Sequence, residues 1–374
     1  MSKIAQGQAG LTRRALLATG VAALAAPMLS RRANAAPVEL TMLAWYGHAE
    51  PDIVAEFEAE NNVKFVPKYY TGGDNMLGLI SQSPAGTYDV ILSDAEYVQA
   101  LNEAGYVEEL DPNDYAISDY FPEFQQFPGN WSDGKLFSLV TRFGFLGVAY
   151  NTDALTEADA STYNVYWEEN LKGKVGHFDW HLPNLGQISL LNGNSNPYDI
   201  DDAGWQGVQD KTMSLRPQIG GFFDYGGTFS SLNDGQMLAF AGIGDWITGV
   251  LEKNGAKVRS VVPEEGGLQW SECFSIGKGS QKAELAKKWI QYITSAKGQA
   301  KSAQMAAYPA LIPNQKGWEV LQAENPAEAK RQGMTKDAGN VIDMIRAGRI
   351  KYRQWPVQQG LEDWNDFWSE YKGA

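Results

Sequence analysis

Residues Val38–Tyr69, with the sequence VELTMLAWYGHAEPDIVAEFEAENNVKFVPKY, contain the pattern that decides the fold class. The short apolar run Val38–Tyr46 predicts a buried strand, and Val63–Tyr69 predicts a second one. Between them, Pro51–Asn61 predicts a helix, because a proline at the first turn precedes apolar residues on one face. A strand, a helix and a strand in this order predict an α/β fold whose mainly parallel sheet is flanked by helices.

The alternation of strands and helices continues through the rest of the chain. Further strands are predicted at Tyr88–Leu92, Val175–Phe178, Met237–Gly244 and Lys257–Val262. Helices are predicted at Asp74–Gln82, Ala95–Ala104, Lys282–Ser295, Gly298–Ala307, Lys336–Ala347 and Gln358–Tyr371. Two long runs of strand-forming residues, Phe137–Asn151 and Gln269–Ile276, are candidate crossings between two lobes. We therefore expect a cleft between one lobe made of residues 36–140 plus 273–313 and another made of residues 141–272 plus 314–374.

Length and charge limit the classes of partner. The chain has 374 residues, 44% of them hydrophobic, and a net charge of −14, so it is long enough to form a large core. The charge argues against a nucleic-acid partner, because lysine and arginine supply most of the affinity for phosphates. Cys273 is the single cysteine, which rules out a disulfide within the chain.

Residues 1–35 have the composition of an export signal. They contain five basic and no acidic residues, an apolar run from Ala15 to Leu29, and small residues up to Ala35. We expect cleavage after Ala35 and a periplasmic protein of 339 residues with a net charge of −19. Arg13-Arg14 favours the twin-arginine route, and an ordinary secretory signal with two adjacent arginines is the alternative.

Aromatic residues and carboxylates recur where the predicted strands end. Ligands of parallel sheets bind beyond the carboxyl ends of the strands, so these residues are candidate ligand contacts. They are Trp45, Tyr46, Asp94, Glu96, Asp179, Asp245 and Trp246, together with Trp270 and Glu272 on one face of the second crossing. A carboxylate and an aromatic face together suit an organic cation. Core packing of the indoles and helix capping by the aspartates are the competing interpretations.

Motifs for catalysis are missing from the sequence. Nucleophile-elbow, zinc-protease and phosphate-loop patterns do not occur, so we expect a binding protein without enzymatic activity, cofactor or metal. The rival hypothesis is a metal-dependent periplasmic enzyme, for which His177, Asp179 and His181 would have to converge on an ion.

Three stretches are distinctive when taken together. They are Tyr88-Asp89-Val90-Ile91-Leu92, Val262-Pro263-Glu264-Glu265-Gly266-Gly267 with Trp270 and Glu272 after it, and Tyr308-Pro309. With them, the chain from Val38 to Lys372 resembles the periplasmic spermidine/putrescine-binding proteins of polyamine ABC transporters. The resemblance implies a two-lobe fold of the type II periplasmic-binding class and a monomer that delivers its ligand to transmembrane permease subunits.

The resemblance also implies a set of ligand-binding residues. Carried over to this sequence, they are Trp45, Trp270, Glu272, Tyr308 and Gln354, with Glu272 as the partner of an ammonium group. The acids after the Val175–Phe178 strand are only partly kept, because Trp180 and Pro183 stand where acids are expected. Arg142 is an additional cation in the first crossing, and if it faces the cleft, a zwitterion such as 4-aminobutyrate or a betaine becomes the alternative ligand. A sensor that presents its ligand to a receptor is an alternative to transport.

Overall fold

A computed structural model describes residues 36–374, of which Pro37–Ala374 form one compact unit. The expected export signal and its cleavage site at Ala35 lie outside the described residues. Among residues 36–374, no helix combines the length and apolar character that a membrane span requires.

The first sheet contains the strand–helix–strand pattern of Val38–Tyr69. Its strands follow the order β13-β12-β3-β1-β2, and β6 also pairs with β12. The bounds are β1 Val38–Ala44, β2 Val63–Tyr69, β3 Val90–Asp94, β6 Leu139–Leu146, β12 Gly267–Ile276 and β13 Ile350–Tyr352. β1 is parallel to both β2 and β3, whereas β12 is antiparallel to β3 and β6, so the sheet is mixed.

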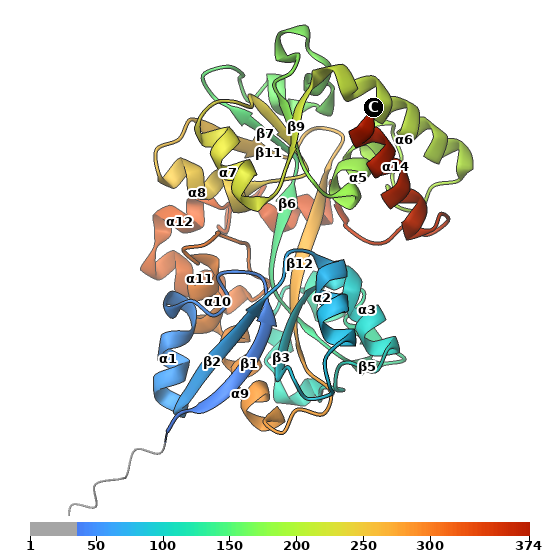
Figure 1. Cartoon of the computed structure of the whole chain (residues 1–374). Helices are drawn as coiled ribbons and strands as arrows, with labels where there is room; N and C mark the ends of the chain where they lie inside the picture. The colour runs from blue at the N-terminus through green and yellow to red at the C-terminus, as the bar shows by residue number, and fades with distance from the viewer. Residues whose placement is uncertain (1–35) are drawn as a thin grey trace, which may run out of the picture. The chain divides into compact units, whose positions relative to one another are not determined.

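Helices cover the first sheet along its length (Figure 1). They include α1 Pro51–Asn61, α2 Gly73–Ser81, α3 Ala95–Glu103, α9 Ala283–Thr294 and α10 Ala296–Ala303. The expected proline starts α1, whose buried Phe57 packs against Trp289 of α9 with ring centroids 5.3 Å apart. The one-sided apolar pattern of α1 therefore anchors it on the sheet, as predicted.

The second sheet has the order β11-β7-β10-β8-β9. Its strands are β7 Val148–Asn151, β8 Val175–Phe178, β9 Ile219–Phe223, β10 Ala239–Ala241 and β11 Val258–Val261. β8 is parallel to β9 and β10, and β7 is antiparallel to β10 and β11. Its helices are α5 His181–Leu191, α6 Asp202–Leu215, α7 Tyr225–Asn233, α8 Asp245–Lys253 and α14 Leu361–Gly373.

Two short connections join strands of one sheet to strands of the other (Figure 1). Gly147 alone separates β6 of the first sheet from β7 of the second. The return runs through residues 262–266, between β11 and β12. The expected crossing in Phe137–Asn151 is therefore present, whereas Gln269–Ile276 is a strand of the first sheet that follows the return crossing.

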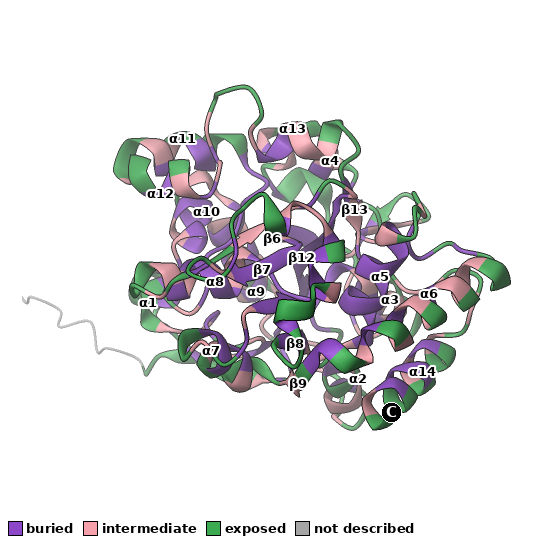
Figure 2. Ribbon diagram, turned by 90° about the horizontal axis from the view of Figure 1, so that it is seen from above, coloured by how far each residue is buried: buried purple, intermediate pink, exposed green. Residues whose placement is uncertain are grey.

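The remaining α-helices and β-strands complete the fold. They are α4 Pro122–Gln125, β4 Trp131–Ser132, β5 Lys135–Leu136, α11 Gln315–Glu324, α12 Pro326–Arg331 and α13 Val341–Arg346. The central strands, β6 and β12 above all, are buried, and exposed residues lie in the connecting loops and on the outer faces of the helices (Figure 2). The expected α/β fold class with sheets flanked by helices is confirmed, but the sheets are mixed and not mainly parallel, because β12 and β7 each pair antiparallel with two strands. The limits of the two lobes stay a prediction; the segment 314–374 supplies β13 to the first sheet and α14 to the helices α5 and α6.

Candidate functional site

A cavity of about 950 Å³ lies where strand ends of the two sheets face each other. Eight of the residues expected to contact a ligand line it: Trp45, Tyr46, Asp94, Asp179, Trp246, Trp270, Glu272 and Tyr308. Trp45 and Asp94 come from the ends of β1 and β3, and Asp179 and Trp246 follow β8 and β10. The structure thus brings together residues that are far apart in the sequence, as the strand-end rule predicts.

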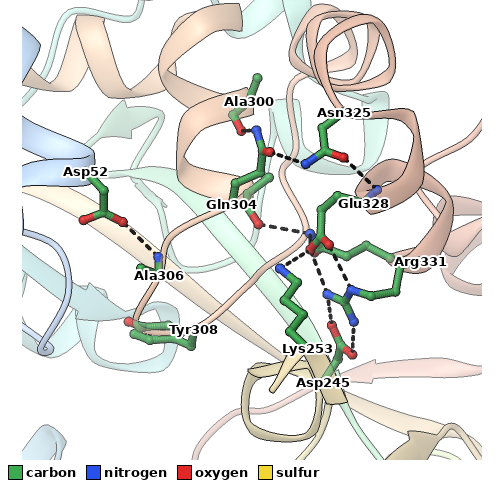
Figure 3. A network of polar contacts seen from close by, with 12 residues as sticks. Asp52, Asp245, Lys253, Ala300, Gln304, Ala306, Tyr308, Asn325, Glu328 and Arg331 are labelled. Carbon is green, nitrogen blue, oxygen red and sulfur yellow. Dashed lines mark hydrogen bonds and ion pairs between the residues drawn. The ribbon is translucent and has the colours of Figure 1, made fainter. Parts of the chain in front are cut away.

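The other four expected residues lie elsewhere. Glu96 and Gln354 line a separate, smaller cavity, and Arg142 is buried behind the wall of the larger one. Asp245 is turned toward α12, where Arg331 donates hydrogen bonds of 2.7 and 3.1 Å to its two oxygens (Figure 3). Arg331 of the distant helix α12 thus orients the Asp245 carboxylate. The sequence around β10 contains no signal for this pairing.

Glu272 is the centre of a buried hydrogen-bond network. The Tyr308 hydroxyl donates to Oε1 at 2.7 Å, and Nε2 of His48 lies 3.1 Å from Oε2. Burial acts to raise the pKa of Glu272, but His48, Arg142 and the Tyr308 hydroxyl outweigh it, so the pKa is lowered. Burial also lowers the pKa of His48. Glu272 is therefore an ionised carboxylate fixed in the cavity wall.

Arg142 supports this carboxylate from behind. Its Nη1 is 3.7 Å from Oε2 of Glu272, its Nη2 donates to the Tyr308 carbonyl at 2.6 Å, and its guanidinium carbon lies 4.4 Å from the centre of the Tyr308 ring. The side chain is only 1% exposed. Arg142 therefore makes its contacts in the protein interior and does not face the cleft. The expectation of a zwitterionic ligand depended on an Arg142 that faces the cleft, so it loses its basis.

Asp94 forms a second acidic centre. Its Oδ1 makes an ion pair of 2.9 Å with Nη2 of Arg353, and the Trp45 indole donates to Oδ2 at 3.3 Å. Asp94 occupies the N-cap position of α3, but its side chain makes no capping hydrogen bond. Burial raises its pKa to about 7, with Glu96 and Glu272 adding to the effect and Arg353 opposing it. The capping interpretation therefore does not apply to Asp94.

Aromatic rings form much of the remaining wall. Trp45 packs on Tyr70 with centroids 4.6 Å apart, and Trp246 packs on Tyr225 at 5.8 Å. Gly144 of β6 lies opposite Trp270 of β12, and a Cβ there would be 2.6 Å from the indole. The missing side chain therefore makes room for the ring. Cations bind favourably over such rings, by about 0.5–2 kcal/mol.

The three residues of the rival metal hypothesis do not converge. His177 hydrogen-bonds to Asn184 and to the Tyr371 hydroxyl, at 2.7 and 3.2 Å. Asp179 accepts hydrogen bonds from Trp368 and Lys372. Within residues 36–374 no group of three or more histidine, cysteine or acidic side chains is arranged to hold a metal ion.

Several lining residues escaped the sequence analysis. Tyr69 is the last residue of β2 and Tyr70 follows it, and Asp224 and Tyr225 follow β9. The strand-end rule would have found the first pair, whereas the second pair follows a strand that was not predicted. Arg353 stands directly before the expected Gln354, and no sequence signal distinguishes which of the two faces the cavity.

The chain belongs to the family of bacterial extracellular solute-binding proteins, whose characteristic sequence matches residues 52–323. Spermidine/putrescine-binding periplasmic protein 1 of Haemophilus influenzae is 24% identical over 273 residues, covering 72% of this chain and 74% of that protein. The spermidine/putrescine-binding periplasmic protein of Escherichia coli is 21% identical over 281 residues, covering 75% and 79%.

A solved structure shares the fold. The spermidine/putrescine ABC transporter substrate-binding protein of Streptococcus pneumoniae superimposes with a TM-score of 0.73 at 18% identity, covering 90% of this chain and 99% of that one. This agreement supports the two-sheet fold class independently of the sequence pattern.

Proposed function

We propose that this solute-binding protein captures a polyamine of the putrescine or spermidine class in the larger cavity and delivers it to an ABC importer. One observation carries the proposal: ionised Glu272 and the acidic Asp94 lie in the wall of one aromatic-lined cavity. Charge-assisted hydrogen bonds to the carboxylates and cation–π contacts with the rings would replace the water that an ammonium group loses. The names of the relatives point to the same class of ligand.

The proposed contacts divide by chemistry. Glu272 and Asp94 bind ammonium groups, while Trp45, Trp270 and Tyr308 cover the methylene chain and the cation. Tyr46, Trp246 and Asp179 line the same cavity and complete the proposed site. No bond of the ligand is made or broken; the work of the protein is to bind in one arrangement of its two sheets and to release in another.

Thermal unfolding with a panel of amines tests the ligand class. Putrescine, spermidine, 4-aminobutyrate, choline and glycine betaine are compared at equal ionic strength. A ligand at about 100 times its dissociation constant adds roughly 2.7 kcal/mol to the free energy of unfolding. We expect this gain with the polyamines; an unchanged melting temperature with every amine would reject the ligand class.

The proposed destination is the periplasm, with residues 1–35 removed on export as a twin-arginine signal, and the mature protein acting as a monomer that docks on permease subunits. Amino-terminal sequencing of the exported protein tests the cleavage after Ala35. Replacing Arg13 and Arg14 together with lysine is expected to block export by the twin-arginine route while leaving an ordinary secretory signal functional.

A further inference from the structure

Arg353 stands between two cavities. It follows β13, and its backbone N–H donates to the Gln269 carbonyl at 2.9 Å, so its position is tied to β12. Beside the larger cavity lies a second one of about 450 Å³. It is bordered by α3, by residues 127–129 and by residues 352–357, and Arg353 lines both cavities.

The two carboxylates that hold Arg353 belong one to each cavity. Asp94 lines the larger cavity and Glu96 lines the smaller one. The guanidinium reaches both, with Nη2 2.9 Å from Asp94 Oδ1 and Nε donating to Glu96 Oε1 at 2.5 Å. The Trp180 ring centre lies 4.2 Å from its central carbon. Three contacts thus fix one cation at the boundary between the cavities.

The smaller cavity repeats the chemistry of the larger one. It has a carboxylate in Glu96 and aromatic rings in Phe127, Tyr352 and Trp355. The Oε1 atom of the buried Gln269 and the Trp355 indole N–H are buried and find no hydrogen-bond partner among the described residues. An alkyl ammonium chain that reached this cavity would find a carboxylate, rings and a free acceptor.

We infer that Arg353 determines the length of the amine that the protein accepts, by occupying with its own guanidinium the place between Asp94 and Glu96 that an ammonium of a longer polyamine would take. The inference rests on the proposed function. With Arg353 in place, Glu96 and the Oδ1 atom of Asp94 already have a cation, and the passage to the smaller cavity is filled. A diamine is then held within the larger cavity, and the additional arm of a triamine finds no free carboxylate, so that spermidine binds the wild-type protein more weakly than putrescine.

Replacing Arg353 with glutamine tests this inference. Dissociation constants for putrescine and spermidine are measured by calorimetry for the wild-type protein and the variant. The change leaves two buried carboxylates without their cation, so we expect the preference for spermidine over putrescine to rise by about tenfold or more. Arg353→Lys keeps a cation there and is the matched control, with a smaller change in the preference.

Filling the smaller cavity provides a second test, and its single variant does not depend on the stability of Arg353→Gln. Ala100 of α3 lines the smaller cavity but not the larger one. Ala100→Leu should leave both dissociation constants of the wild-type protein unchanged and should cancel the spermidine gain of Arg353→Gln.

The outcomes distinguish the role of Arg353 from polyamine binding itself. An unchanged ligand preference in Arg353→Gln, or a loss of spermidine binding in Ala100→Leu alone, overturns the inference while leaving polyamine binding intact. Failure of the wild-type protein to bind either amine rejects the proposed function and the inference together.

Discussion

Glu272 and Arg142 form a buried charge pair whose two roles, in binding and in stability, can be separated. Glu272→Gln is expected to weaken polyamine binding by about 2–5 kcal/mol, because the proposed ammonium loses its carboxylate. It also leaves the Arg142 guanidinium, 1% exposed, without its counter-charge. Removing one partner of a buried pair costs about 3–5 kcal/mol of stability. Calorimetric titration measures the first effect and urea unfolding the second.

The double variant Arg142→Met, Glu272→Gln distinguishes these effects. Replacing both buried charges is expected to restore most of the unfolding free energy but not the affinity, since the ammonium still lacks a partner. Glu39→Gln, at an exposed position of β1, is the matched control and should change neither quantity. Unchanged affinity in Glu272→Gln would show that another carboxylate holds the ligand.

The raised pKa of Asp94 predicts how ligand binding depends on pH. Its pKa is raised to about 7, so below pH 7 the ligand-free side chain is mostly protonated. A cation bound beside it favours the ionised form, so binding releases a proton. The association constant is therefore expected to rise, by up to about tenfold per pH unit, from pH 5.5 to 7 and to level off above. Calorimetry over this range measures the slope.

The groups around Asp94 identify it as the source of this slope. Arg353, Glu96, Glu272 and Trp45 face it, and of these acids Glu272 has a lowered pKa. Burial lowers the pKa of His181 in the same cavity to about 4, so it does not titrate in the range measured. Asp94→Asn should bind more weakly and without the slope; a slope that persists in this variant would assign the proton to another group.

At the scale of residues, the sequence predicts candidate contacts but not their partners. Trp45, Asp94 and Glu272 were identified because each follows or lies on a predicted strand, and strand ends meet at one edge of a sheet. Asp245 satisfied the same rule, yet Arg331, 86 positions further on, turns it away. Pairings between charges so far apart in the sequence depend on tertiary packing, which a strand pattern does not contain.

At the scale of elements, the close approach of the two crossing segments depends on Gly147. A Cβ there would lie 2.1 Å from the carbonyl oxygen of Val261, the last residue of β11. The clash would involve backbone atoms, so it could be relieved only by a shift of one of the strands that these residues adjoin. Gly147→Ala is expected to lower the unfolding free energy by about 1–3 kcal/mol, the usual range for overpacking, as measured in urea.

Gly78 in α2 is the matched control for this substitution. A Cβ at Gly78 would meet no atom within 4 Å. Gly78→Ala should therefore raise the unfolding free energy by about 0.4–1 kcal/mol, because alanine loses less backbone freedom in a helix. Equal effects of the two alanines would contradict the steric role of Gly147.

The elements themselves were predicted to different degrees. α1, β2 and β8 have the bounds expected from the sequence, because each combines a clear apolar period with a turn signal. β9, with the sequence IGGFF, was missed because two adjacent glycines weaken any strand pattern. β13 has three residues and is defined by its pairing with β12, so local sequence carries little information about it.

At the scale of the whole described unit, one ion network joins helices that belong to different sheets. α8 packs against β11 of the second sheet, while α12 packs on α11, and α11 on α10, which contacts β6 of the first sheet. Arg331 of α12 binds Asp245 of α8, and Lys253 of α8 lies 2.7 Å from Glu328 of α12 (Figure 3). The network is formed in the same arrangement in which both sheets line the larger cavity.

Because of this position, the network is expected to influence affinity without touching the ligand. Arg331→Met removes the link to Asp245 and thereby destabilises the arrangement that proposed ligands bind, so affinity should fall by roughly three- to tenfold, about 1 kcal/mol. Lys336→Met, which breaks a pair whose side chains are 73% and 60% exposed, is the control and should leave affinity unchanged. Equal dissociation constants for Arg331→Met and the wild-type protein, in calorimetry at one salt concentration, would mean that the two sheets keep their binding arrangement without this link.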